Sequence, residues 1–134
     1  MKREPKWLSA AAILAIHERL IAEHGGAAGL RDEQLLESAL ASPLNHLAYA
    51  DADIFGLAAA YAMALTRNHP FHDGNKRVAL TAAGVFLELN GYRLNASELD
   101  ASGAARALAA REIDESAFAD WLRRSSGKVR RRKR

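Results

Sequence analysis

The segment between residues 67 and 77 concentrates the side chains of this sequence that could do chemistry. Its eleven residues, RNHPFHDGNKR, include two imidazoles, one carboxylate, two amides and three cations, and apolar stretches lie on both sides. Polar groups beside a hydrophobic core cost desolvation free energy unless they are paired or bind a ligand. The composition of this segment therefore predicts a ligand-binding loop between two buried helices.

Gly74 marks the start of the second apolar stretch, where a helix is expected. The first turn of a helix has unpaired backbone N–H groups and the positive end of the helix dipole, and it therefore favours an anion. Gly74 would let the backbone approach a phosphate closely, while Lys76 and Arg77 would add positive charge. A polyphosphate fits these features, and Asp73 could give an oxygen to its Mg²⁺ ion. His69, just before this turn, could accept a proton from an incoming hydroxyl near neutral pH.

The stretch HPFHDGNKR resembles the signature of the Fic/Doc family, which reads H-x-F-x-D/E-G-N followed by K-R or G-R. The lysine at position 76 makes the motif resemble that of the Doc (death-on-curing) toxin branch, because the AMP-transferring branch normally has glycine at this position. That branch also has a further arginine where this chain has Leu80. Upstream, residues 25–40 contain GG, GLRD and LLESAL, which resemble the Doc N-terminal pattern. The resemblance covers roughly residues 7–125.

This resemblance implies an all-α fold, a single compact helical bundle of the Fic/Doc type. It also implies a toxin of a toxin–antitoxin pair, a kinase-type phosphotransferase that uses ATP and Mg²⁺. Its target would be a Thr or Ser hydroxyl of a translation factor, expected to be elongation factor Tu, and translation would stop. An antitoxin protein would block the site with its C-terminal segment. Many Fic proteins instead carry an inhibitory S/T-x-x-x-E helix, but no Ser or Thr here has Glu four positions later.

The resemblance also assigns roles to individual residues. His69 is expected to be the catalytic base, and Asp73 the carboxylate associated with Mg²⁺. Phe71 is expected to pack the loop onto the core, while His72 is expected to face solvent. The residues expected to bind the phosphates of the nucleotide are Arg67, Gly74, Asn75, Lys76 and Arg77.

Three alternatives remain open from the sequence. The same fold could transfer AMP or another nucleotidyl group to a protein hydroxyl. The chain could instead be a non-enzymatic helical protein that binds nucleic acid or a partner. The dipeptide His72-Asp73 also occurs in HD-domain phosphohydrolases, which hold a metal, although that interpretation leaves residues 74–77 unexplained. A Walker A loop does not match, because the required spacing and the following Ser or Thr are missing.

The composition limits the class of protein. A chain of 134 residues is about the size of one domain, and its 49% apolar content can build a core. It has 29 alanines but only 7% aromatic residues, which favours closely packed helices over strands. The absence of cysteine excludes disulfides, thiol nucleophiles and cysteine-bound zinc. No apolar run approaches the ~18 residues of a membrane span. We therefore expect a cytoplasmic protein that does not bind a membrane.

Helical spacing of apolar residues predicts six helices. Residues 43–52 are expected to be irregular, with a possible hairpin or short flap, because Pro43 should end the helix before it. Ser or Asp stands as an N-cap at the start of every expected helix except the one from residue 75, which follows Gly74. The expected helices are residues 9–24, 32–40, 53–68, 75–89, 97–110 and a last one that begins at Asp114.

Charge is distributed unevenly along the chain. Residues 1–122 hold 11 Lys and Arg against 16 Asp and Glu, whereas residues 123–134 hold eight basic residues and no acid. A basic terminus of this kind is typically solvated, and it can bind nucleic acid through phosphates without sequence preference. We therefore expect a Fic/Doc-like domain over residues 1–125 and a disordered basic tail over residues 126–134. Nucleic acid would bind only through that tail.

Overall fold

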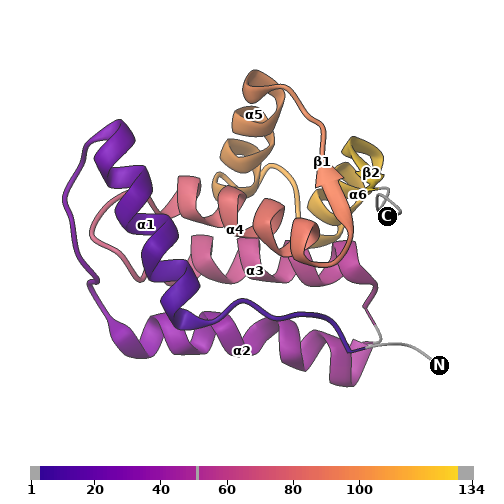
Figure 1. Cartoon of the computed structure of the whole chain (residues 1–134), viewed down its shortest axis with the longest axis horizontal. Helices are drawn as coiled ribbons and strands as arrows, with labels where there is room; N and C mark the ends of the chain where they lie inside the picture. Colours follow the sequence, from indigo (N-terminus) through magenta and orange to yellow (C-terminus); the bar gives the residue numbers. More distant parts are fainter. Residues whose placement is uncertain (1–3, 51, 130–134) are drawn as a thin grey trace, which may run out of the picture.

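Six helices and one pair of short strands make up the part of the chain described by the computed structural model, residues 4–50 and 52–129 (Figure 1). The all-α fold predicted from the sequence is confirmed. Within the described residues, no helix combines the length and the apolar character needed to cross a membrane. The helices are α1 (Ala10–His24), α2 (Glu33–Ala50), α3 (Ile54–Asn68), α4 (Asn75–Leu89), α5 (Glu98–Ala109) and α6 (Glu115–Ser125), and the strands are β1 (Tyr92–Leu94) and β2 (Ser126–Lys128).

Helix α3 is the centre of the core. It packs against α2 on one side and α4 on the other, and α6 covers a third side (Figure 1). Its buried alanines allow the neighbouring helices to approach closely, and α4 contributes further buried small residues. Tyr61 fills the space next to Phe86 and accepts a hydrogen bond from Leu8 N at 3.0 Å. Burial raises the pKa of the Tyr61 hydroxyl above its ordinary value.

The helix starts follow the N-caps that the sequence indicates. In each case a Ser or Asp side chain accepts a hydrogen bond from the main-chain N–H three residues later, at 2.8 to 3.1 Å. One such cap contributes about 1 kcal/mol to the stability of a helix. The predicted caps are thereby confirmed at Ser9, Asp32, Asp53, Ser97 and Asp114.

Helix α2 differs from its prediction, because it continues through Pro43 to Ala50. The expected irregular segment or flap at residues 43–52 is therefore wrong over residues 43–50. Proline at this position removes one backbone hydrogen bond, but its ring is buried and Leu47, one turn later, packs against the core. His46 also contacts the Glu115 carboxylate of α6, which ties this second half of α2 to the rest of the bundle.

The C-terminal strand is a second difference. β2 pairs antiparallel with β1, so that Leu94 lies opposite Ser126 and Tyr92 opposite Lys128. The next residue, Val129, donates its N–H to Gly91 O at 2.9 Å. The predicted disorder of the tail from residue 126 is therefore wrong for residues 126–129, which are held by main-chain hydrogen bonds. The remaining tail residues, 130–134, lie outside the described part of the chain.

Arg123, near the end of α6, is also held by the fold. Its guanidinium contacts Asp53 at 2.8 Å and Asp120 at 2.6 Å. Burial acts to raise the pKa of Asp53, but hydrogen bonds from the Gly56 N–H and from Arg123, together with the charge of Arg123, hold that pKa below its ordinary value. The N-cap of α3 thus also forms an ion pair with α6.

Candidate active site

The segment that the sequence singles out forms a short loop between α3 and α4. His69 ends α3 in the left-handed conformation (φ 53°, ψ 54°), and its N–H donates to Leu65 O at 3.3 Å. Gly74 begins α4, also at positive φ (79°). Phe71, between them, is 1% exposed, which confirms that it anchors the loop on the core. His72 is exposed, as predicted.

The connection between α1 and α2 supports this loop from outside. The N–H groups of Arg31 and Asp32 both donate to Pro70 O, at 2.7 and 3.0 Å. The Arg31 guanidinium donates to His69 O at 2.6 and 2.9 Å and to Asn68 O at 3.1 Å. Carbonyl groups at a helix C-terminus lack partners within the helix. Arg31 satisfies two of them in α3 and so fixes the backbone that carries His69.

Asn75, in the first turn of α4, uses its whole side chain within the loop. Its Oδ1 accepts from Phe71 N at 3.1 Å and its Nδ2 donates to Phe71 O at 2.9 Å, which fixes the orientation of the amide. The same Nδ2 lies 3.1 Å from His69 Nδ1. The residue is 4% exposed. Its side chain is therefore taken up by the loop, and only its main-chain N–H remains for the predicted phosphate contact.

This amide also determines the tautomer of the His69 ring. Because Asn75 Nδ2 can only donate, His69 Nδ1 must accept, and the neutral ring then carries its proton on Nε2. To accept a further proton the ring must release Asn75, either by turning at χ2 or by exchanging tautomers. A neutral hydrogen bond contributes about 1 kcal/mol, so this release is a small step.

His17 is a loop support that the sequence analysis did not assign. It lies on the buried face of α1 and is 4% exposed. Its ring stacks on Phe71, with centroids 3.8 Å apart and planes at 8°, and its Nε2 lies 2.9 Å from Asp73 O. Since a carbonyl oxygen only accepts, Nε2 is the donor. The available signal was its spacing of four residues from the buried Ile13.

Asp73 faces the loop between α1 and α2. Its Oδ2 accepts from Ala27 N at 3.1 Å and its Oδ1 from Gly74 N at 3.2 Å. Gly26 permits this approach, since an added Cβ would lie 2.9 Å from Oδ2. Each oxygen keeps a free lone pair, and Mg²⁺ is commonly held by one or two carboxylates together with phosphate oxygens. Asp73 therefore fits the predicted ion, although no three His, Asp or Glu of the described chain gather into a metal site by themselves.

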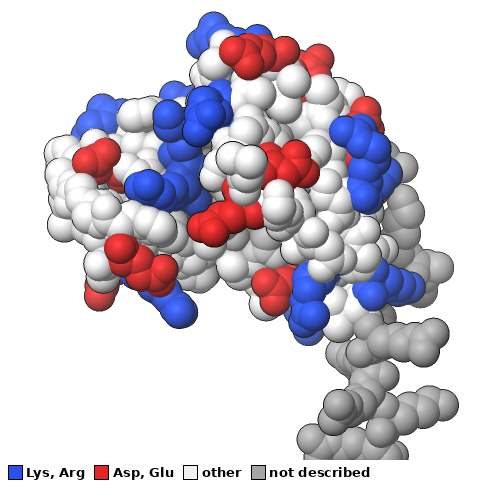
Figure 2. All heavy atoms as spheres, turned by 90° about the horizontal axis from the view of Figure 1, so that it is seen from above, with Lys and Arg blue, Asp and Glu red and all other residues white. Residues whose placement is uncertain are grey.

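A cavity of about 420 Å³ brings most of the predicted site residues together. Figure 2, which views the molecule from above, shows a group of basic side chains in its left half. The cavity is lined by His69, His72, Asp73, Gly74, Asn75, Lys76, Arg77 and Leu80 of the loop and α4, and by Ser102, Ala105 and Arg106 of α5.

Arg67 is the exception among the predicted phosphate-binding residues. It lines a different cavity of about 460 Å³, together with Arg111 and Glu112 from the connection between α5 and α6. The structure thus does not bring Arg67 together with the other predicted residues. Ser102 and Arg106, which do line the site, were missed because α5 carries no recognisable motif.

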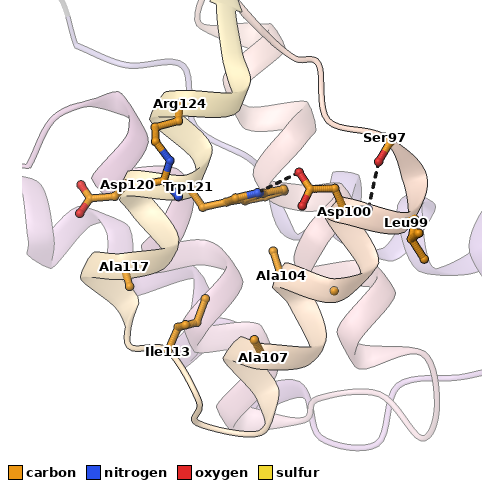
Figure 3. A pocket seen from close by; sticks show the side chains of 11 residues that line it. Ser97, Leu99, Asp100, Ala104, Ala107, Ile113, Ala117, Asp120, Trp121 and Arg124 are labelled. Carbon is orange, nitrogen blue, oxygen red and sulfur yellow. Dashed lines mark hydrogen bonds between the residues drawn. The ribbon is translucent and has the colours of Figure 1, made fainter.

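Another hollow, of about 610 Å³, lies between α5 and α6 (Figure 3). Small residues such as Ala104 and Ala117 line it, and the indole N–H of Trp121 donates to the Asp100 carboxylate at 3.3 Å. None of the predicted site residues lies there. The groups suited to phosphate chemistry are at the loop instead.

Fold and site together define an all-α domain with a polar loop, led by Gly74, at the start of a buried helix. The model of the Fic/DOC family matches residues 7–87, and the chain belongs to this family. It is 34% identical over 121 residues to "Protein kinase doc" of Escherichia phage P1, covering 90% of this chain and 95% of that protein. It is 43% identical over 74 residues to "Toxin Doc" of Mycolicibacterium smegmatis (strain ATCC 700084 / mc(2)155), covering 54% and 57%. The Doc-branch resemblance is confirmed, and it replaces the HD-domain alternative.

Proposed function

We propose that this chain is the toxin of a toxin–antitoxin pair, a phosphotransferase that moves the γ-phosphoryl group of ATP to a Thr or Ser hydroxyl. The expected target is a translation factor, elongation factor Tu. One observation carries the proposal: His69, Asp73, Lys76 and Arg77 line a single cavity at the N-terminus of α4. The names of the two relatives, a protein kinase and a toxin, support it.

The proposed chemistry depends on positioning and on charge neutralisation, as phosphoryl transfer generally does. Backbone N–H groups at the start of α4 and the side chains of Lys76 and Arg77 bind the phosphate oxygens. Mg²⁺ held at Asp73 would neutralise charge on those oxygens. The target hydroxyl oxygen forms a bond to the γ-phosphorus, the bond to the bridging oxygen of the β-phosphate breaks, and ADP leaves.

His69 takes the proton of the target hydroxyl in this proposal. His69 is exposed, and its ring contacts Asn75 in the first turn of α4. Since Nδ1 accepts from Asn75 in this structure, the ring releases that bond before it accepts the proton. Arg31 keeps the backbone fixed during this movement, because its contacts are to main-chain carbonyls rather than to the ring.

The experiment separates phosphoryl transfer from nucleotidyl transfer. Purified protein is incubated with Mg²⁺, elongation factor Tu and ATP labelled either at the γ or at the α position. Label from γ alone supports the proposal, and label retained from α favours the nucleotidyl alternative. No label from either position, with folded protein that is free of antitoxin, contradicts both enzymatic functions. Total cell extract in place of the factor tests for a different protein target.

Two variants test the role of His69. His69→Ala should reduce the rate of transfer by at least about a hundredfold, which is the lower end of the range for a general base. The protein should stay folded, because the substituted residue is exposed. His24→Ala is the matched control, since His24 is an exposed histidine at the end of α1 away from the cavity. Transfer that persists in His69→Ala would remove this ring from the mechanism.

We also propose an antitoxin whose C-terminal segment covers the same cavity. The cavity is open to solvent beside exposed Lys76 and Arg77, so that an acidic or hydrogen-bonding peptide could compete with phosphate there. A peptide of that segment should reduce ATP binding in a competitive manner. Inhibition that leaves ATP affinity unchanged would exclude direct blocking of the cavity.

A further inference from the structure

We propose that Arg106 of α5 is a third cation of the phosphate-binding site and binds the polyphosphate from the side opposite the first turn of α4. This inference rests on the proposed function, because it assigns a further residue to the same cavity. No part of the signature HPFHDGNKR contains Arg106, and it lies beyond the residues 7–87 that the family model matches.

The position of α5 places this side chain at the cavity. Helix α5 packs against α4, and Arg106 lies in its last turn with an exposed side chain. Ser102, one helical turn earlier, lines the same cavity, as does Ala105. Residues four apart lie on one face of a helix. This face of α5 is therefore turned toward the cavity that Lys76 and Arg77 also line.

The charges that line the cavity favour an anion. Within the described residues, Lys76, Arg77 and Arg106 take part in no salt bridge, while Asp73 is the one acidic residue of the lining. Both oxygens of Asp73 already accept main-chain N–H groups. Three like charges near the positive end of the α4 dipole repel one another, and an anion bound between them would offset this repulsion. A polyphosphate supplies several negative charges in one molecule.

The guanidinium group gives Arg106 a specific role. Its planar fork matches two oxygens of a phosphate, which an ammonium group cannot do. Lys76 and Arg77 come from one helix turn, so that a cation from α5 adds contacts on another side of the phosphate chain. Arg106 should therefore increase the affinity for a triphosphate more than the affinity for the nucleoside.

The test uses isothermal titration calorimetry with the full chain and three probes: Mg-ATP, inorganic tripolyphosphate and adenosine. Arg106→Gln removes the charge but keeps a long polar side chain. We expect about a tenfold rise in Kd for Mg-ATP and for tripolyphosphate, near the lower end for a charge-assisted hydrogen bond at an exposed position, and no change for adenosine. Arg106→Lys should fall between the wild type and Arg106→Gln. The KM for ATP should rise together with these Kd values.

Arg124→Gln is the matched control, because Arg124 is an exposed arginine of α6 that lines the other hollow (Figure 3). It should bind both anions like the wild type. Thermal unfolding of each variant, followed by circular dichroism, reports whether the fold is intact. Wild-type affinity in a folded Arg106→Gln variant would overturn the inference, and so would failure of the wild type to bind either anion. Arg106-dependent binding of tripolyphosphate without transfer to any protein would uphold it while contradicting the proposed function.

Discussion

His17→Phe tests whether the α1 histidine holds the Asp73–Gly74 peptide in place. Phenylalanine keeps an aromatic ring against Phe71 but removes the donor that lies 2.9 Å from Asp73 O. A carbonyl that loses its partner beside a 4% exposed side chain costs about 1 to 3 kcal/mol. We expect a loss of about 2 kcal/mol. For a domain of this size, that lowers Tm by roughly 8 °C, at about 4 °C per kcal/mol.

His17→Ala should be more destabilising, since it also removes the stacked ring and leaves a cavity. Aromatic pairs contribute about 1 kcal/mol beyond burial, and truncation of a large buried side chain costs about 3 to 5 kcal/mol. We therefore expect a loss of about 4 kcal/mol. Phenylalanine thus separates the hydrogen bond from the packing, because only alanine removes both.

The assay is thermal and urea unfolding, with tripolyphosphate affinity measured on the folded variants. His24→Phe is the control, because His24 is exposed at the end of the same helix and should leave both quantities unchanged. His17→Phe should also weaken anion binding, since Gly74 follows the carbonyl that is released. A His17→Phe variant with wild-type stability and wild-type affinity would refute the role assigned to this hydrogen bond.

Two further predictions concern contacts around the loop and at α6. Asp53→Asn should lower stability by about 0.5 kcal/mol at pH 7, as expected for an exposed ion pair with Arg123, while keeping the N-cap. The pKa of Asp53 is lower in the folded protein than in the unfolded chain, where it is about 3.9. The stabilisation by Asp53 is therefore present above the unfolded pKa and is lost as the pH falls through the folded pKa, so the wild type and Asp53→Asn should converge in urea unfolding at low pH. A difference in stability that stays constant with pH would contradict the ion pair. Arg31→Gln should lower kcat for transfer with little change in tripolyphosphate affinity, because Arg31 contacts the backbone at His69 rather than the phosphate-binding turn. An equal loss of affinity would show that Arg31 supports the whole loop, and Arg31→Lys should recover part of kcat.

Local sequence signals predicted most of the fold. Ser or Asp before an apolar repeat located the helix starts, since capping depends on neighbours three residues apart. Pro43 led to a wrong prediction for the end of α2, because that prediction also used only neighbouring residues. The rule that proline ends a helix weighs one local hydrogen bond, whereas Leu47 and His46 hold the following turn through contacts with distant parts of the chain. The strand Ser126–Lys128 carried no strand pattern, because its three residues depend on pairing with β1.

The loop was predictable because its chemistry is contained in consecutive residues. Arg67 and Arg106 show the limit of predicting a site from neighbouring residues. Arg67 is two residues from His69 in sequence, but it belongs to α3, where two positions differ by about 200° around the axis. It therefore faces the connection between α5 and α6. Arg106 is remote in sequence and reaches the cavity only because α5 packs on α4.

The left-handed backbone at His69 places two opposing demands on one position. At the end of a helix this conformation suits glycine, and a residue with a side chain gives up roughly 1 kcal/mol or more to adopt it. The chain nevertheless has an imidazole there, with its backbone supported by Arg31. Selection for thermal resistance alone would be expected to replace this histidine with glycine. A more heat-resistant protein would then have lost the ring that the proposed transfer requires, so thermal stability and the proposed activity place opposite demands on this residue.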